Sequence, residues 1–370
     1  MPLLARTLLA PLTIEVRAGV LGRLAGVLSD RRISAGGDVA VVVGPGVGEQ
    51  VAAAVRPQLR RCDLITITGG TVAAALELGG KLSARSYDAV VGIGGGKTID
   101  TVKYAASRHG LPMVTVATSL AHDGIASPVS TLERDGASIS YGVHTPYAVL
   151  VDLDYVQRSP SWLTRSGIGD ALSNLCATAD WELAHDARDE PVDGLSLALA
   201  RSGAEAVLAH TGGAADPQFL ATLANALVLG GVAMAVAGTS LPCSGGCHEI
   251  GHAIAEHHRS AGTHGEQVGL GALFCTFLRE TRLPGPPATP GTATRRLREA
   301  LRRHGLPVTP AGLGLSAAQF ARAVERAPQT RPGRYTILEH LDLRPAAIEA
   351  AVAEFVEIMD AGPGPAAGSD

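Results

Sequence analysis

The chain has 370 residues, of which 46% are hydrophobic and 18% charged, a balance typical of a folded protein long enough for two domains. The net charge of −4 argues against a nucleic-acid-binding surface, and the five cysteines form no disulfide framework. We find no apolar run that would span a bilayer and no convincing signal peptide, so we expect a cytoplasmic protein without membrane insertion.

Residues 1–157 alternate apolar, β-branched runs with helical patterns. The strand-like runs are 38–46, 63–70, 87–96, 111–119 and 146–153. The helical patterns between the first four runs are 48–59, 71–86 and 97–110. Runs that are apolar throughout are typical of parallel strands covered by helices on both faces. We therefore predict an α/β domain with a parallel, doubly wound sheet.

Residues 158–370 have helical periodicity and no convincing strands. The helical patterns are 159–185, 191–213, 216–238, 295–305 and 346–360. The apolar run 228–238 comes nearest to a membrane span, and we interpret it as a buried core helix. We expect a Pro-rich loop at 282–296 and a frayed tail at 362–370. The second half is thus predicted to be an all-helical domain.

A glycine-rich turn, GIGGGKTID, places Gly94, Gly95 and Gly96 between a predicted strand and a predicted helix. Backbone amides at a helix N-terminus bind a pyrophosphate, and a Cβ would hold that group away. A tight turn of an α/β sheet would explain the glycines equally well, and the motif is not the GxGxxG fingerprint. The second strand ends in TITGGT, without the acid that commonly binds the adenosine ribose, so the choice between NAD and NADP stays open.

Five histidines fall within SGGCHEIGHAIAEHHRSAGTHGEQV, residues 244–268, which we interpret as one helix and the loop after it. His248 and His252 share one helix face, and His264 follows in the expected loop. Two such imidazoles with one carboxylate would form a three-ligand site with an open fourth position, as in catalytic zinc sites. The alternative is solvated histidines, and we favour it for His257 and His258. We interpret Cys243 and Cys247 as small packing residues beside the site.

Two further segments carry candidate polar groups. Asp170, in SGIGDALSN, lies near the start of a predicted long helix, where an acid would also favour the helix dipole. The segment VTVATSLAHDGIASPVS follows a predicted strand, and Thr118 and Ser119 there could donate to a cofactor. In its HDGIASP portion, His122, Asp123 and Ser127 are either ligand-binding groups or ordinary turn residues.

Four stretches together resemble one family: GIGGGKTIDTVKYAA, TVATSLAHDGIASP, GIGDALSN and the SGGCHEIGH…HGEQVGLG block. The chain resembles the sn-glycerol-1-phosphate dehydrogenases. They belong to the superfamily of iron-containing alcohol dehydrogenases, glycerol dehydrogenases and dehydroquinate synthases. HDGIASP discriminates the family, whereas GGGK and HGE occur across the superfamily. The resemblance runs in order over residues 38–275, and the C-terminal part adds little.

The resemblance implies a dehydroquinate synthase-like fold, with a nucleotide-binding domain at 1–157 and a helical metal-binding domain at 158–370. It implies one metal ion per subunit, zinc or another divalent cation, held by Asp170, His248 and His264. Asp123 would contact the substrate and His252 would relay a proton. NAD or NADP would be bound by Gly94, Gly95, Gly96, Lys97, Asp100, Thr118, Ser119 and Ser127. We also expect a small-molecule substrate and a homo-oligomer.

The activity implied is reduction of dihydroxyacetone phosphate to sn-glycerol 1-phosphate, or turnover of a related polyol or polyol phosphate. Two departures concern the substrate and the site: Gly142 and His144 stand where relatives often carry lysines, and Cys247 replaces the acid of SG-x-E-H. A sugar phosphate cyclase like dehydroquinate synthase is an alternative, distinguished by the absence of net NADH formation. A non-catalytic metal- and nucleotide-binding paralogue is the other.

Overall fold

The computed structural model of the chain describes residues 10–45, 47–59, 61–283 and 291–361. Internal contacts divide the chain into two compact units, one made of 1–167 with 193–240 and the other of 168–192 with 241–370. Segment 193–240, assigned to the helical domain on sequence, therefore groups with the sheet. A boundary at 157/158 between independently folding domains stays a prediction.

The first unit is built on a parallel sheet. In the part of the chain that is described, six strands pair in the order β1-β8-β5-β4-β2-β3, all parallel. Their bounds are β1 Thr13–Arg17, β2 Val39–Val43, β3 Cys62–Thr66, β4 Ala89–Gly94, β5 Met113–Ala117 and β8 Ala148–Asp152. Strands β2, β5 and β8 are buried at every residue, which explains their uninterrupted apolar sequences. The predicted parallel sheet is confirmed.

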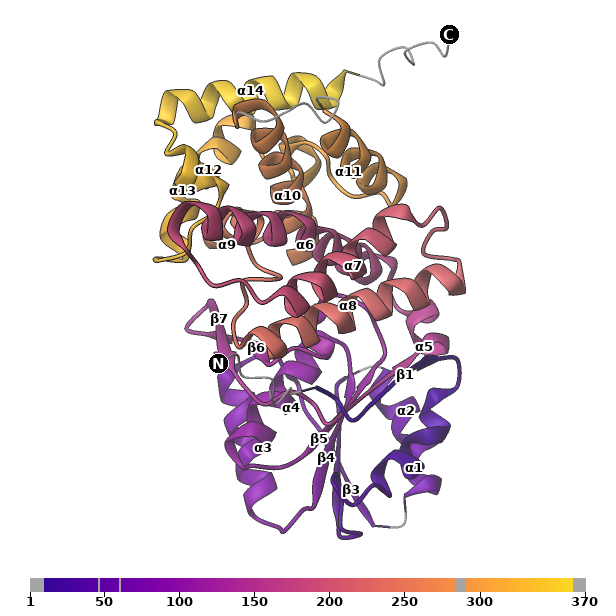
Figure 1. The fold of residues 1–370 in the computed structure, drawn as a ribbon. Coiled ribbons are helices and arrows are strands. Elements are labelled where there is room, and N and C mark those ends of the chain that lie inside the picture. Colours follow the sequence, from indigo (N-terminus) through magenta and orange to yellow (C-terminus); the bar gives the residue numbers. More distant parts are fainter. Residues whose placement is uncertain (1–9, 46, 60, 284–290, 362–370) are drawn as a thin grey trace, which may run out of the picture. The chain divides into compact units, whose positions relative to one another are not determined.

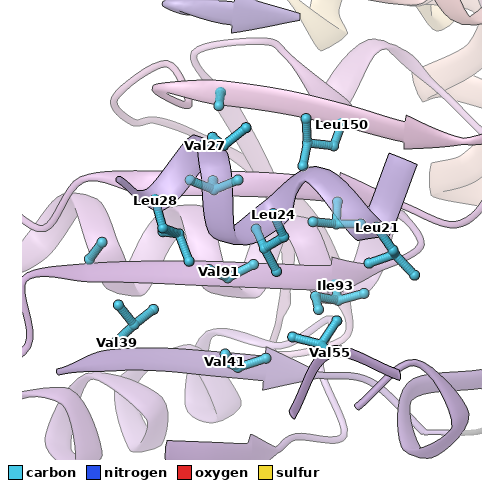
Figure 2. Packing of buried hydrophobic residues seen from close by; sticks show 14 of the residues in the cluster. Leu21, Leu24, Val27, Leu28, Val39, Val41, Val55, Val91, Ile93 and Leu150 are labelled. Atoms are coloured by element: carbon cyan, nitrogen blue, oxygen red, sulfur yellow. The ribbon is translucent and has the colours of Figure 1, made fainter. Parts of the chain in front are cut away.

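Helices cover both faces of this sheet. Figure 1 shows α1 (Leu24–Leu28) and α2 (Val47–Val55) beside one face, and α3 (Val72–Ser83) and α4 (Gly96–Arg108) beside the other. In Figure 2, buried side chains of α1 and the turn before it pack over the strands. The labelled members of this cluster are Leu21, Leu24, Val27, Leu28, Val39, Val41, Val55, Val91, Ile93 and Leu150. Burying each such side chain contributes about 1.5–3 kcal/mol.

A short antiparallel hairpin follows β5 and was not predicted. It consists of β6 (Val129–Arg134) and β7 (Ala137–Gly142). The turn residues Asp135 and Gly136 have φ angles of 52° and 76°. Two positive φ angles in a two-residue turn match the twist of a hairpin, so the Asp-Gly pair is the sequence signal that predicts it.

The strand order places a topological switch next to β4. From β2 the chain moves to β3 at the sheet edge and then returns to β4 on the other side of β2. Ligands of open α/β sheets bind outside the carboxyl ends of the strands at such a point. Gly94 at the end of β4 pairs in register with Ala117 at the end of β5, so the glycine turn and the Thr118 loop start at the same edge.

The remaining helices of the first unit are α5 (Leu153–Arg158), α7 (Gly194–Ala209), α8 (Pro217–Ala237) and the start of α6 (Ser161–Arg188). By length and composition α8 is able to cross a membrane, with a mean hydropathy of 2.0 over its most apolar 18 residues. However, 67% of that window is buried inside the protein. This burial supports the interpretation of 228–238 as part of a core helix.

The second unit contains helices and no strand among its described residues, as predicted. Its helices, besides the rest of α6, are α9 Gly246–His257, α10 His264–Arg282, α11 Thr292–Arg303, α12 Ala317–Thr330, α13 Ile337–Leu341 and α14 Pro345–Asp360. The prediction that His264 lies in a loop is wrong, because His264 is the first residue of α10. Residues 1–9, part of the expected Pro-rich loop (284–290) and the expected frayed tail (362–370) lie outside the described residues. The end of that expected loop is helical, because α11 begins at Thr292.

Candidate functional site

Three predicted metal ligands meet in the second unit. Asp170 comes from α6, His248 from α9 and His264 from α10, and their ligand atoms all lie within 4.8 Å of one another. The Oδ1 atom of Asp170 is 3.7 Å from Nε2 of His248 and 3.4 Å from Nε2 of His264. Bonds of the usual length to a tetrahedral zinc ion set ligand atoms about 3.3 Å apart. The three side chains therefore fit a divalent cation with little movement.

Glycines let the helices that carry these ligands approach closely. A Cβ on Gly169 would lie 2.0 Å from the carbonyl oxygen of Gly265, next to His264. A Cβ on Gly271 would lie 2.6 Å from the carbonyl oxygen of Cys247. Asp170 lies well inside α6, so capping that helix does not explain its carboxylate.

A capping box sets the first residue of α10. Thr263 donates its backbone N–H to Oε2 of Glu266 at 2.8 Å, and Glu266 donates its own to Oγ1 of Thr263 at 3.3 Å. This reciprocal pair satisfies two amides at the helix start. It places His264 at the first helical position, with its side chain 41% exposed.

Electrostatics favour the protonation states that a cation needs. Asp170 is only 4% exposed. Burial raises the pKa of Asp170, but the adjacent rings of His248 and His264 outweigh burial and hold that pKa below its ordinary range. Burial lowers the pKa of His248 to about 4, against the opposing effect of Asp170. An ionised carboxylate beside a neutral imidazole is the form that binds metal ions.

The sulfur of Cys247 lies beside the ring of His248. Nδ1 of His248 lies 3.4 Å from Sγ of Cys247, and that sulfur donates to the carbonyl oxygen of Ser173 at 3.6 Å. A thiol that donates to Ser173 can accept from Nδ1–H of His248, and in that tautomer Nε2 keeps its lone pair on the side of Asp170. Cys247 is thus more than the small packing residue expected from sequence.

His252 lies one helical turn after His248 and contacts an arginine that sequence reasoning missed. Nε of Arg331 donates to Nδ1 of His252 at 3.4 Å, and Nη2 of Arg331 is 3.5 Å from Nε2 of His252. The rings of His248 and His252 have centroids 6.2 Å apart. Burial and then the charge of Arg331 lower the pKa of His252 to about 2. A proton relay through His252, which stays a prediction, would have to start from the neutral ring.

The remaining histidines of 244–268 behave differently. The side chain of His257 is 55% exposed and its Nε2 is 3.9 Å from Glu256, while His258 ends α9 and is half-buried. Neither belongs to the group of Asp170, His248 and His264, which we call the triad.

In the first unit, the glycine turn forms a crowded strand-to-helix junction. A Cβ on Gly95 would lie 2.8 Å from Oγ of Ser119, and one on Gly96 would lie 2.2 Å from Nε2 of His122. Gly95 caps α4 without a side chain, so within the described residues no side chain caps its first amides. Open amides at a glycine turn fit a phosphate group. His122, although within HDGIASP, was not predicted to lie against Gly96.

The serines predicted to bind the cofactor are buried near this turn. Ser119 is 3% exposed, and its Oγ has no hydrogen-bond partner among the described residues. A buried hydroxyl of this kind is the group that a cofactor would satisfy. Thr118 donates its backbone N–H to the carbonyl oxygen of Gly94, and Ser127 donates its hydroxyl to the carbonyl oxygen of Val129. Asp123 begins a 3-10 turn, and its carbonyl oxygen accepts from the Ser127 amide at 3.1 Å.

Two other predicted cofactor residues, Lys97 and Asp100, lie on α4. Lys97 is exposed and its methylenes lie against Gly70. Asp100 is 4% exposed, and its Oδ1 is 3.1 Å from Nζ of Lys103. Because Lys103 also donates to the carbonyl oxygen of Ser127 at 3.3 Å, this ion pair links α4 to the HDGIASP loop.

Comparison with known proteins identifies the family of the chain. The family model of iron-containing alcohol dehydrogenases matches residues 15–160. Glycerol-1-phosphate dehydrogenase [NAD(P)+] of Hyperthermus butylicus is 35% identical over 334 residues, 89% of this chain and 92% of that protein. The protein of that name from Aeropyrum pernix is 33% identical over 350 residues, 92% of this chain and 95% of its own.

The chain belongs to the glycerol-1-phosphate dehydrogenase family. The predicted family is thereby confirmed. Among solved structures, glycerol dehydrogenase of Schizosaccharomyces pombe is similar with a TM-score of 0.76 at 18% identity, covering 96% of this chain and 91% of that one. This likeness confirms the predicted fold class.

Proposed function

We propose that this chain is an NAD(P)- and metal-dependent oxidoreductase that interconverts dihydroxyacetone phosphate and sn-glycerol 1-phosphate. The observation that carries the proposal is the triad of Asp170, His248 and His264, converging in a chain of this family. A small polyol phosphate is the substrate class that the relatives' name indicates.

The residues have separate proposed tasks. Asp170, His248 and His264 would hold the cation, for which we propose zinc because a buried carboxylate and two imidazoles suit it. When bound, the cation supplies a Lewis acid for the substrate oxygen and the nicotinamide supplies the hydride. Cys247 orients the His248 ring through Nδ1. Asp123 would contact the substrate, and neutral His252 would move a proton.

The nucleotide would lie at the glycine turn. The three glycines and Ser119 give it open amides and a buried hydroxyl. The proposed cofactor residues are Gly94, Gly95, Gly96, Lys97, Asp100, Thr118, Ser119 and Ser127. We further propose a cytoplasmic homo-oligomer, with domains at 1–157 and 158–370.

A substrate panel combined with metal analysis tests the function. The purified protein is assayed with NADH and NADPH against dihydroxyacetone phosphate, dihydroxyacetone and glyceraldehyde phosphate, alongside elemental analysis. We expect coenzyme oxidation with the first substrate and one bound divalent ion per chain. In the reverse direction NADH or NADPH should accumulate, whereas a cyclase would regenerate its coenzyme.

A ligand variant tests the site. His264→Ala should lose both the bound metal and turnover, because His264 supplies one of the three ligand atoms. His257→Ala is the control, since His257 is exposed and lies outside the triad. Full activity of a chelated, metal-free preparation would contradict the proposal.

A further inference from the structure

Arg331 is a largely buried cation that no carboxylate of the described residues contacts. It follows α12, and both of its side-chain hydrogen bonds are to His252. No carboxylate oxygen of the described residues lies within 4.0 Å of its guanidinium nitrogens. Burial, and then the charge of Arg334, lower the pKa of Arg331. Burying a guanidinium without an anion is costly, so this arrangement favours a negatively charged ligand.

The guanidinium lies beside the candidate metal centre. His252, which accepts from Arg331, forms an edge-to-face contact with the ligand His248. The charge of Arg331 is also close enough to His248 to lower the pKa of that ring. The third ligand, His264, has a side chain that is 41% exposed, so a small molecule can reach the triad.

The surrounding charges add to this preference for an anion. A divalent cation held by one carboxylate and two neutral imidazoles keeps a net positive charge. Glu249, the acid whose charge acts on Arg331, accepts a hydrogen bond from Oγ1 of Thr336 at 3.1 Å. His252 engages Nε and Nη2 of Arg331, and within the described chain no hydrogen bond involves Nη1. Nη1 is therefore available to a ligand.

We propose that Arg331 is an anion-binding residue beside the metal centre and that it holds the phosphate monoester of the substrate. This inference rests on the proposed function for the identity of the phosphate ester, but not for the existence of the anion site. The guanidinium forms paired, charge-assisted hydrogen bonds to phosphate oxygens, which a lysine cannot reproduce. Arg331 would therefore favour phosphorylated over free ketones, and His252 would orient its guanidinium.

Three variants separate the anion site from a structural role. Arg331→Gln removes the charge, and Arg331→Lys keeps a charge but lacks the planar guanidinium. Arg326→Gln is a control on the exposed surface of α12. Arg326 pairs with Glu256 at 3.3 Å and its side chain is 43% exposed. Circular dichroism and thermal melting establish that each variant is folded.

The first readout is steady-state kinetics. For Arg331→Gln we expect the KM for dihydroxyacetone phosphate to rise about 10- to 100-fold, the effect of losing a hydrogen bond to a charged group. The KM of the Arg331→Lys variant should lie between the values of Arg331→Gln and the unchanged protein. The preference for dihydroxyacetone phosphate over dihydroxyacetone, measured as the ratio of their kcat/KM values, should fall by a similar factor, because dihydroxyacetone has no phosphate for Arg331 to bind. The KM for NADH and NADPH should stay within about twofold, because the coenzyme would not contact Arg331. An unchanged KM for dihydroxyacetone phosphate, or a rise confined to NADPH, would overturn the proposal.

The second readout does not depend on activity. Inorganic phosphate is titrated calorimetrically into metal-loaded and metal-free protein. Weaker binding to Arg331→Gln than to Arg326→Gln in both forms supports the anion site, and equal binding refutes it. If the unchanged protein fails to reduce dihydroxyacetone phosphate, the proposed function fails, and this titration still decides whether Arg331 binds phosphate.

Discussion

At the scale of single residues, the sulfur of Cys247 has a defined task. It lies between Nδ1 of His248 and the carbonyl oxygen of Ser173, so one thiol can accept a hydrogen bond from the first and donate one to the second. Burial raises the pKa of Cys247 well above its ordinary value, which keeps the donating proton on sulfur. Partners of this kind hold a ligand ring in the tautomer and orientation that a metal ion requires.

Removing that sulfur should weaken metal binding. We expect Cys247→Ala to lower metal affinity about 10- to 100-fold, as loss of such outer partners does. Cys247→Ser, which can still accept and donate, should retain more of the affinity. Competition with a chromogenic chelator at fixed pH measures both. Cys275→Ala controls for the loss of thiol volume in the core. Equal metal affinity in all three variants would refute the proposed role of Cys247.

At the scale of elements, close helix packing creates the site. Helices α6 and α10 approach so closely at Gly169 that any side chain there would meet the backbone of Gly265. The ligands Asp170 and His264 each follow or precede one of these glycines directly in the chain. A change in the spacing of the two helices therefore changes the separation of two ligand atoms.

Replacing Gly169 by alanine should destabilise the protein even though alanine has the higher helix propensity. Alanine in a helix is more stable than glycine by about 0.5–1 kcal/mol, but a forced backbone contact costs about 1–3 kcal/mol. We expect Gly169→Ala to lower the free energy of unfolding in urea and to weaken metal binding. Gly80→Ala in α3 is the control, because no atom lies within 4 Å of its Cβ position. Stabilisation of both variants would contradict the packing argument.

At the scale of the whole molecule, the cation joins three segments that are distant in sequence. Asp170, His248 and His264 lie on separate helices of the second unit. A ligand that binds the folded chain and not the unfolded chain stabilises the folded state by mass action. Metal binding should therefore contribute to the stability of this unit as well as to chemistry.

Chelation should lower the melting temperature. With free metal at one hundred times its Kd, binding adds about 2.7 kcal/mol to the free energy of unfolding. Differential scanning calorimetry before and after chelation measures the change, and readded metal should restore the original transition. His264→Ala should show no shift on chelation. Identical transitions of the unchanged protein with and without metal would exclude a metal site at the triad.

The sequence alone predicted the strands of the parallel sheet and the candidate metal ligands. Apolar runs predicted the buried strands of the parallel sheet because burial on both faces leaves no polar alternation. The spacing of the histidines indicated a metal site, and the resemblance supplied Asp170. The hairpin of β6 and β7 was missed although its Asp-Gly turn carries a local signal.

Tertiary structure alone decided how these groups are supported. Arg331 is 79 residues from His252 along the chain, and no periodicity within either segment reports their contact. The Cys247–Ser173 contact likewise joins α9 to α6 across 74 residues. Secondary structure leaves a periodic trace because neighbours repeat at fixed spacing, whereas contacts between helices depend on how side chains pack in three dimensions. The sequence therefore determined which elements form and which residues are candidate ligands, and packing decided which side chains surround them.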